Sequence, residues 1–294
     1  MARMRRATAV MVLPILFGIA LAGDEKTAAQ GMLLITGGEF MMGTDDGLPF
    51  EGPAHRVAVD SFHIDAHEVT NAQFARFADA TGHVTESEKL GWSGVFDPRP
   101  GRWMKSDGAD WRHPNGPQSS HENMPDFPAV HVSWNDAVAY CAWQGGRLPT
   151  EAEFEYAARG GRKNARYAWG NALTPRGAHQ ANLWQGEFPV DDRALDGYAG
   201  LAPVKQFAPN GFGLYDMTGN VWEWVADWYG ADYYARSPAS NPRGPETGTQ
   251  KVHRGGSWLC SENYCRGYRL AARMMTPPDS GLNNLGFRCA ADAG

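Results

Sequence analysis

The segment RGGSWLCSENYCRGYR, residues 254–269, contains two of the chain's four cysteines, Cys260 and Cys265. Two thiolates that converge on one point are soft ligands, which select Cu(I), Zn(II) or iron–sulfur centres over hard cations. A lasting zinc site needs further ligands, and the only other Cys or His at this segment is the preceding His253, so zinc is disfavoured. The residue count therefore favours Cu(I) as the metal that this pair could hold.

The four cysteines, Cys141, Cys260, Cys265 and Cys289, can pair in three ways. In an oxidising compartment one interpretation is two structural disulfides. The other is one structural disulfide and one reactive pair, in which Cys260 and Cys265 stay reduced and act together. The residues alone leave both alternatives open.

The histidines do not suggest a rival metal site. The chain has no H-E-x-x-H motif, and His63 and His67 lie in a segment predicted to pass from a strand into a turn, where they do not share a helix face. Serine-hydrolase and phosphate-loop motifs are also missing from the sequence, so those functions have no support.

Oxygen-bearing side chains gather in two glycine-containing segments. ANLWQGEFPVDDRALDGY and YDMTGNVWEWVADW contain Asn182, Asp191, Asp192, Asp196, Asp216, Glu223 and Asp227. Oxygen ligands in such loops suit Ca(II), which also accepts backbone carbonyls. The alternative, which composition alone favours, is that these acids cap turns and helix starts.

Three helices can be placed from their start and stop signals. Capping-box patterns predict helices that begin after Ser133 and after Thr150, and Cys141 lies on the first of them. A third helix is predicted over 70–82, with phenylalanines three apart on one face.

The remaining elements are expected to be short. Strands are predicted within 32–43, 55–64 and 285–290. The stretch 85–128 combines turn residues with aromatics, which predicts an ordered loop packed by its own side chains. The chain has 35 Gly, 19 Pro and 11 Trp, so we expect much irregular structure.

The first residues have the pattern of a secretory signal peptide, predicted over 1–22. A basic start is followed by an apolar run and small residues. The alternative, an uncleaved anchor, is disfavoured because the run is short and contains Pro14. We therefore expect an exported protein, periplasmic or secreted, with no stable membrane span after leader removal.

The charge pattern argues against one class of partner. The net charge is −6 and the cations are scattered, so no basic stripe is present and nucleic acid is not an expected partner.

A family resemblance emerges from segments that follow one another in order. They are GGEFMMGTDD, GGRLPTEAEFEYAARGG, YAWGN, NGFGLYDMTGNVWEWVADWY, SWLCSENYC, RGYRLAAR and NLGFRCA. From about residue 32 to 292 the chain resembles the formylglycine-generating enzymes, the sulfatase-modifying factor family. GGRLPTEAEFEYAARGG and GNVWEW mark a fold shared with sulfoxide synthases and non-catalytic relatives, whereas the paired cysteines mark the catalytic branch.

The resemblance implies a fold and an activity. The fold would be one domain of irregular α/β (α+β) type, the formylglycine-generating enzyme fold, related to the C-type lectin fold and low in regular secondary structure. The activity would be that of an oxygen-dependent oxidoreductase acting on a protein cysteine. Its substrate would be an unfolded or nascent sulfatase polypeptide, whose Cys-x-Pro-x-Arg cysteine becomes Cα-formylglycine with O2 and a thiol reductant.

The resemblance also assigns roles to residues around the cysteines. Cys260 and Cys265 would hold Cu(I), with Ser257 and Trp222 in the same pocket. Two further residues, Arg273 and Asn284, would line the peptide groove; for each of them the alternative is a structural salt bridge or turn.

Two calcium sites and one disulfide are implied in the same way. The first site would use Asn182, the carbonyl of Leu183, Asp196 and the carbonyl of Tyr198; the second would use Asp216, the carbonyls of Gly219 and Val221, and Glu223. Animal members tend to have Asn at the position of Asp216. Cys141 and Cys289 would form a family disulfide, while the positions of a second animal bridge are Ala158 and Leu270 here, so both of its ends are missing.

Rival functions follow from the same fold. A non-catalytic binding module is the first, and the presence of both cysteines argues against it. A sulfoxide synthase would need an additional iron-binding helical domain, for which the chain has no room. Action in the cytoplasm before export is the alternative to an exported enzyme, because many bacterial sulfatases are thought to be modified there.

Overall fold

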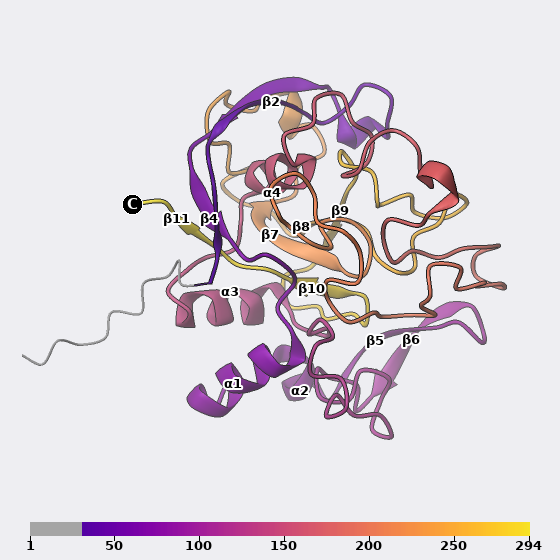
Figure 1. Cartoon of the computed structure of the whole chain (residues 1–294). Helices are drawn as coiled ribbons and strands as arrows, with labels where there is room; N and C mark the ends of the chain where they lie inside the picture. The colour runs from indigo at the N-terminus through magenta and orange to yellow at the C-terminus, as the bar shows by residue number, and fades with distance from the viewer. Residues whose placement is uncertain (1–30) are drawn as a thin grey trace, which may run out of the picture.

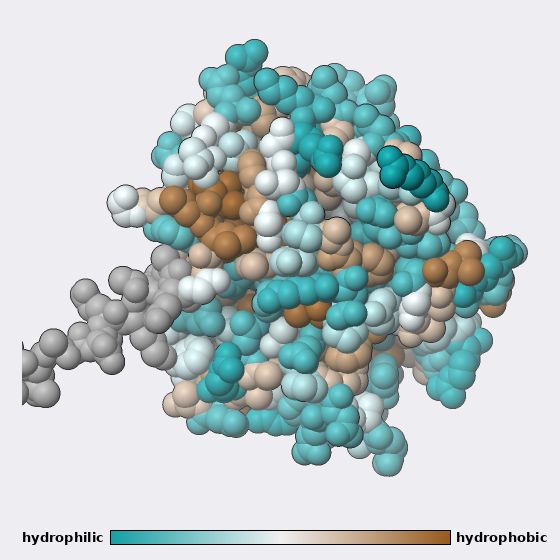
Figure 2. All heavy atoms as spheres, viewed as in Figure 1, coloured by the Kyte–Doolittle hydropathy of each residue, from teal (hydrophilic) through white to brown (hydrophobic). Residues whose placement is uncertain are grey.

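The protein is described from a computed structural model, in which residues 31–294 are placed. The predicted signal peptide, residues 1–22, lies outside the described residues. No helix among residues 31–294 is long and apolar enough to cross a membrane. The face in Figure 2 is mainly hydrophilic; an apolar patch lies over the ribbon of β4, and smaller apolar groups lie near the centre and at the right edge.

Four short α-helices begin at capping boxes, as expected where Ser or Thr precedes Glu, Gln or Asp by three residues. They are α1 (Asn71–Thr81), α2 (Glu86–Leu90), α3 (Trp134–Trp143) and α4 (Glu151–Arg159). The three predicted helices are confirmed. Helix α2 was not predicted, because its capping box at Thr85 is followed by only five helical residues, inside the stretch that was expected to be a loop.

The central sheet has the strand order β10-β7-β8-β9 (Figure 1). Its strands are β7 (Trp222–Trp228), β8 (Lys251–Arg254), β9 (Arg273–Thr276) and β10 (Leu285–Phe287). β7 is antiparallel to β8 and parallel to β10, and the register pairs Trp222 with Leu285. This sheet therefore brings the segments before β10 and after β8, which contain Asn284 and the two cysteines, to the start of β7.

Three smaller sheets complete the fold. They consist of β1 (Leu33–Ile35), β4 (Phe62–Ile64) and β11 (Ala290–Asp292); β2 (Gly38–Met42) and β3 (His55–Val59); and β5 (Trp92–Asp97) and β6 (Arg102–Asp107). Short 3-10 turns lie at Pro49–Glu51, Pro175–Gly177 and Tyr233–Arg236.

The strand predictions need two corrections. None of the segments 32–43, 55–64 and 285–290 is one strand, because each divides into two strands that belong to different sheets: β1 and β2, β3 and β4, and β10 and β11. The β5–β6 hairpin, with six paired positions, lies in the stretch 85–128 that was expected to be a loop. The glycines and prolines of this stretch indicated a loop. The two strands are stabilised by pairing with each other across a hairpin turn, and neither is marked by an apolar run in the sequence.

The disulfide implied by the resemblance is present. Cys141 of α3 is bonded to Cys289, just before β11, across 148 residues of sequence, with the Cα atoms 5.5 Å apart. Ala158 and Leu270, the two positions without a bridge, are both buried in one apolar cluster. Apolar packing therefore occupies the place where a second bridge would lie.

A buried ion network joins α4 to the central sheet. Arg254 of β8 contacts Glu151 at 3.0 Å and Glu155 at 2.6 Å, and all three side chains are almost completely buried. Arg254 also donates to the carbonyl of Leu270 at 2.7 Å. The network thereby fixes the C-terminal end of the cysteine-bearing loop to α4.

We expect Arg254→Ala to lower the free energy of unfolding by about 3–5 kcal/mol, because it leaves buried carboxylates without their partner. Urea unfolding with both disulfides intact measures the change. Arg56→Ala is the control, since its pair with Glu39 is exposed and should contribute about 0–1 kcal/mol. A loss below about 1 kcal/mol for Arg254→Ala would contradict the account.

Candidate functional site

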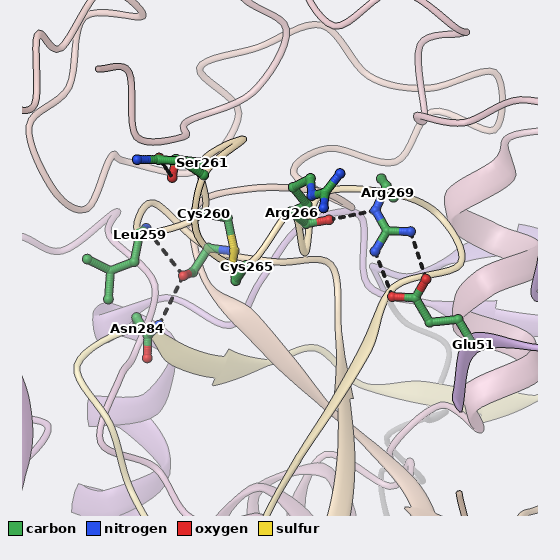
Figure 3. Close-up of a disulfide and its surroundings, with 10 residues drawn as sticks. Glu51, Leu259, Cys260, Ser261, Cys265, Arg266, Arg269 and Asn284 are labelled. Atoms are coloured by element: carbon green, nitrogen blue, oxygen red, sulfur yellow. Dashed lines mark hydrogen bonds and ion pairs between the residues drawn. A yellow bond between two sulfur atoms is a disulfide. The ribbon is translucent and has the colours of Figure 1, made fainter. Parts of the chain in front are cut away.

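Cys260 and Cys265 are bonded to each other in the structure (Figure 3). This corrects the expectation that they stay reduced. The chain between them folds back, because the amides of Tyr264 and Arg266 both point to the carbonyl of Ser261, and the two cysteine Cα atoms come within 5.2 Å. Cys260 is buried, whereas Cys265 is partly exposed. The pair is thus an oxidised couple with one sulfur-bearing residue open to solvent.

Trp222 and the buried Cys260 both lie close to Gly267. A Cβ added to Gly267 would lie 2.4 Å from the Trp222 ring and 2.9 Å from the sulfur of Cys260, so both approach this glycine closely. The ring of Trp222 also meets His253 edge-on at 4.9 Å. Burial lowers the pKa of His253 to about 3, so this imidazole is neutral at physiological pH. The uncharged ring of Trp222 therefore lies near the buried side of the disulfide, and His253 packs behind it without a charge.

Ser257 and Asn284 form a hydrogen-bonded unit with Cys260. The amide of Ser257 donates to the Cys260 sulfur at 3.4 Å, and Asn284 Nδ2 donates to Ser257 Oγ at 3.0 Å. The amide of Leu259 donates to the same Oγ at 3.3 Å. The carbonyl of Asn284 accepts from the amide of Trp222, which ties β10 to β7 at the site. The structure therefore brings four predicted residues together: Cys260, Ser257, Trp222 and Asn284.

Arg273 is not part of this group. Its guanidinium is almost completely buried and makes a bidentate ion pair with Glu151, at 2.7 and 2.6 Å, and it also donates to the carbonyls of Phe50 and Gly230. This arrangement supports the structural salt bridge that was the alternative to a role in the peptide groove. Its partner lies 122 residues away in sequence, so no local pattern announced the pair.

A cavity of about 590 Å³ lies beside the cysteine loop, and sequence reasoning did not identify it. Its lining includes Phe96 and Asp97 of β5, Trp184, Asp192 and Trp258. The only signal was the aromatic content of the loop-like stretch 85–128.

An aromatic ladder connects this cavity to Cys265. The ring of Phe96 stacks on Phe188 at 5.2 Å, and Phe188 stacks on Tyr264 at 4.0 Å. Tyr264 directly precedes Cys265. An extended segment lying in the cavity could therefore reach the partly exposed cysteine along an aromatic surface.

Two members of the first predicted calcium set, the Leu183 carbonyl and Asp196, lie together. Asp196 accepts from the amides of Leu183 and Tyr198, and the side chain of Gln185 donates to both the Leu183 carbonyl and Asp196. The Leu183 carbonyl oxygen and an Asp196 carboxylate oxygen thus both accept from Gln185 Nε2. Asn182 Oδ1 is buried and has no hydrogen-bond partner among residues 31–294. This orphaned oxygen, with the converging pair, fits a hard cation.

The second predicted set is incomplete. Both carboxylate oxygens of Glu223 are paired with Arg288, at 2.6 and 2.7 Å, and Asp216 accepts from the amide of Lys205. Within the described part of the chain, no group of three or more His, Cys, Asp or Glu side chains is arranged to hold a metal ion. The residues predicted for this site therefore do not fit a cation as they stand.

Glu68 is a further acid at the second set that the sequence patterns did not reveal. It is completely buried, and its Oε2 has no partner among the described residues. Burial, followed by the charges of Asp216 and Glu223, raises the pKa of Glu68 well above its usual range. Glu68 follows β4 in the segment DAHEVT, where Asp65 and His67 are also polar, so no local pattern singled it out.

Comparisons with known proteins support the resemblance. A family model described as sulfatase-modifying factor enzyme 1-like domain matches residues 20–293. A formylglycine-generating enzyme from Thermomonospora curvata is 54% identical over 285 residues, which cover 90% of this chain and 94% of the relative. A mouse protein named inactive C-alpha-formylglycine-generating enzyme 2 is 45% identical over 282 residues, which cover 90% of this chain and 86% of the relative.

A solved structure matches the fold as well. PvdO from Pseudomonas aeruginosa aligns with a TM-score of 0.68 at 31% identity, covering 89% of this chain and 94% of that one. The predicted irregular α/β (α+β) fold, low in regular secondary structure and related to lectin-like folds, is confirmed.

If the first calcium set binds a cation, Ca²⁺ should raise the melting temperature of the metal-stripped protein, because a ligand that binds only the folded state stabilises it by mass action. Asp196→Asn should remove most of the increase. Asp191→Asn is the matched control, since the Asp191 carboxylate lies in the same loop but pairs with Arg193 at the surface. Equal calcium responses in both variants would show that the cation binds elsewhere.

Proposed function

The chain belongs to the sulfatase-modifying factor enzyme 1-like family, and we propose on this premise that it is a formylglycine-generating enzyme. It would convert the cysteine of a Cys-x-Pro-x-Arg segment in a sulfatase polypeptide to Cα-formylglycine. The observation that carries the proposal is the Cys260–Cys265 couple, buried at Cys260 and partly exposed at Cys265, which stacked aromatic rings connect to a neighbouring cavity.

The electron balance of this reaction requires both O2 and a reductant. Conversion of the cysteine side chain to an aldehyde, with release of hydrogen sulfide, removes two electrons from the substrate and consumes one water. Reduction of O2 to two waters takes four electrons. Two external thiols supply the other two electrons and become a disulfide.

The chain's own thiols suit a soft metal. In their reduced form Cys260 and Cys265 are the residues that would hold Cu(I), which matches the preference of paired thiolates. When bound there, Cu(I) supplies the electron-transfer chemistry toward O2. The partial exposure of Cys265 gives an external thiol access to open the disulfide first.

We assign to Ser257 an action on the reacting sulfur or oxygen. Its Oγ already accepts two hydrogen bonds, from Asn284 and Leu259, and within residues 31–294 its O–H has no acceptor. Asn284 therefore orients the hydroxyl, which keeps a proton to donate. In the reduced form the Ser257 amide would stabilise a thiolate on Cys260, and Trp222 would exclude water from that side.

The aromatic cavity is the proposed binding site for the substrate segment. An extended peptide there would place its cysteine at Cys265, the accessible member of the couple. Asp192 lines the same cavity, and burial raises the pKa of its carboxyl group because burial disfavours the charged form. A neighbouring cation would favour that charged form. The guanidinium of the substrate's Arg is such a cation, so we assign Asp192 as its acceptor.

The second candidate function is a non-catalytic binding module. The disulfide between the two cysteines favours it, because a permanent bond would leave no thiol to react. A mouse relative that is 45% identical to this chain is named as inactive, so a chain of this similarity can carry a name that denies the activity.

Export is proposed from the N-terminal pattern, and the Cys141–Cys289 disulfide is compatible with an oxidising compartment. Fractionation of cells that express the C-terminally tagged chain should place it outside the cytoplasm with a shortened N-terminus. Full-length protein in the cytosolic fraction would overturn this part of the proposal.

The activity is tested with protein that has been reduced, loaded with Cu(I) and supplied with O2, dithiothreitol and a Cys-x-Pro-x-Arg peptide. We expect an aldehyde product, detected by mass spectrometry and by a hydrazide probe. Cys265→Ala should lower kcat/KM at least about 1,000-fold. Glu262→Gln, an exposed change in the same loop, is the control and should be neutral. No product, or full activity of Cys265→Ala, would favour the binding module.

A further inference from the structure

A buried ion pair connects the cysteine loop to a distant part of the chain (Figure 3). Arg269 Nη1 and Nη2 contact Glu51 Oε2 and Oε1 at 2.7 and 2.6 Å, across 218 residues of sequence. Glu51 is 1% exposed and ends the 3-10 turn Pro49–Glu51. Two parallel hydrogen bonds between charged groups define both the distance and the orientation of the arginine.

Arg269 also contacts Arg266, the residue directly after Cys265. Its Nε donates to the carbonyl of Arg266 at 3.1 Å, and its backbone amide points to the same carbonyl at 3.4 Å. Arg266 has a φ of +46°, which costs free energy in a residue other than glycine. The hydrogen bonds from Arg269 hold the backbone in this conformation.

The opposite face of the same segment is fixed by close packing. Gly267 lies so near Trp222 and the sulfur of Cys260 that a side chain at this position would collide with both. Glu51 on one side and Trp222 on the other therefore confine residues 265–269. By contrast, residues 262–264 between the cysteines are exposed.

We propose that Glu51 and Arg269 are positioning residues that hold the Cys265 sulfur opposite the Cys260 sulfur when the disulfide is open. The covalent bond then no longer restrains the exposed loop, and the ion pair, together with the packing of Gly267, restrains the segment after Cys265. Holding two groups in the correct geometry raises their effective concentration. The Glu51–Arg269 ion pair would therefore increase the stability of the disulfide. It would also increase the affinity of the two reduced thiols for a ligand that both of them bind.

The stability of the disulfide can be measured without any activity. Reduced dithiothreitol attacks the Cys260–Cys265 bond, that bond breaks, and the products are two protein thiols and cyclic oxidised dithiothreitol. The equilibrium constant is obtained for the full chain, metal-free, in dithiothreitol buffers of graded composition. Alkylation and peptide mapping then separate this couple from Cys141–Cys289.

Glu51→Gln should shift this equilibrium about tenfold toward the thiols, because the neutral amide cannot make the bidentate ion pair. For a two-electron couple a tenfold change corresponds to about 30 mV. Arg269→Lys should shift it in the same direction, since lysine keeps the charge but loses the planar fork and the Nε donor. If Glu51→Gln fails to melt cooperatively, Arg269→Lys decides the outcome.

Glu153→Gln is the matched control. Glu153 also makes a bidentate pair, with Arg147 at 2.7 and 2.8 Å, and also caps a helical turn, but on α4 rather than at the cysteine loop. It should leave the equilibrium within twofold of the unsubstituted protein. An unchanged equilibrium in Arg269→Lys, or an equal shift in Glu153→Gln, would overturn the proposal.

A kinetic measurement extends the inference and rests on the proposed function. Glu51→Gln should lower kcat for the peptide about tenfold while KM stays within twofold, because the cavity that binds the peptide is not altered. A raised KM with unchanged kcat would contradict a positioning role. Absence of turnover in the unsubstituted protein would count against the proposed function alone and leave the thiol–disulfide result standing.

Discussion

The buried contact between Arg254 and two glutamates of α4 is the constraint on which the site depends. Glu151 and Glu155 share Arg254, and Glu151 also pairs with Arg273, so one helix fixes β8 and β9 together. The cysteine loop connects these two strands, and Arg254 additionally binds the carbonyl of Leu270 at its end. Such charges are costly to bury unless each has a partner, so the network can adopt only a narrow range of arrangements. The loop therefore starts and ends at defined positions.

Within that frame, the local contacts around the cysteines divide the loop into a fixed and an accessible side. Cys260 is held by the Ser257 amide and covered by Trp222, whereas Cys265 lies where the exposed part of the loop rejoins the core. A couple of this kind can exchange with an external thiol through one sulfur while the other stays in place. The structure shows the oxidised form, and the proposed function requires the reduced form of the same site.

Sequence reasoning succeeded where the signal is local or where the family motif is continuous. The helices after Thr70, Ser133 and Thr150 are encoded by capping boxes a few residues long. The resemblance supplied the Cys141–Cys289 pairing and the group around Cys260. For Arg273 the structure supports the salt-bridge alternative, and Glu51 was overlooked. Their partners lie 122 and 218 residues away, a separation that no local pattern contains. The redox state of Cys260 and Cys265 also depends on how the loop folds back.

The central claim is that Cys260 and Cys265 form a reversible thiol pair that can hold Cu(I). X-ray absorption at the copper edge, on reduced full-length protein with one equivalent of Cu(I), tests it most directly. The account predicts sulfur neighbours around copper that decrease when either Cys260→Ser or Cys265→Ser is introduced. Copper surrounded only by nitrogen and oxygen, or a spectrum that neither substitution changes, would contradict it.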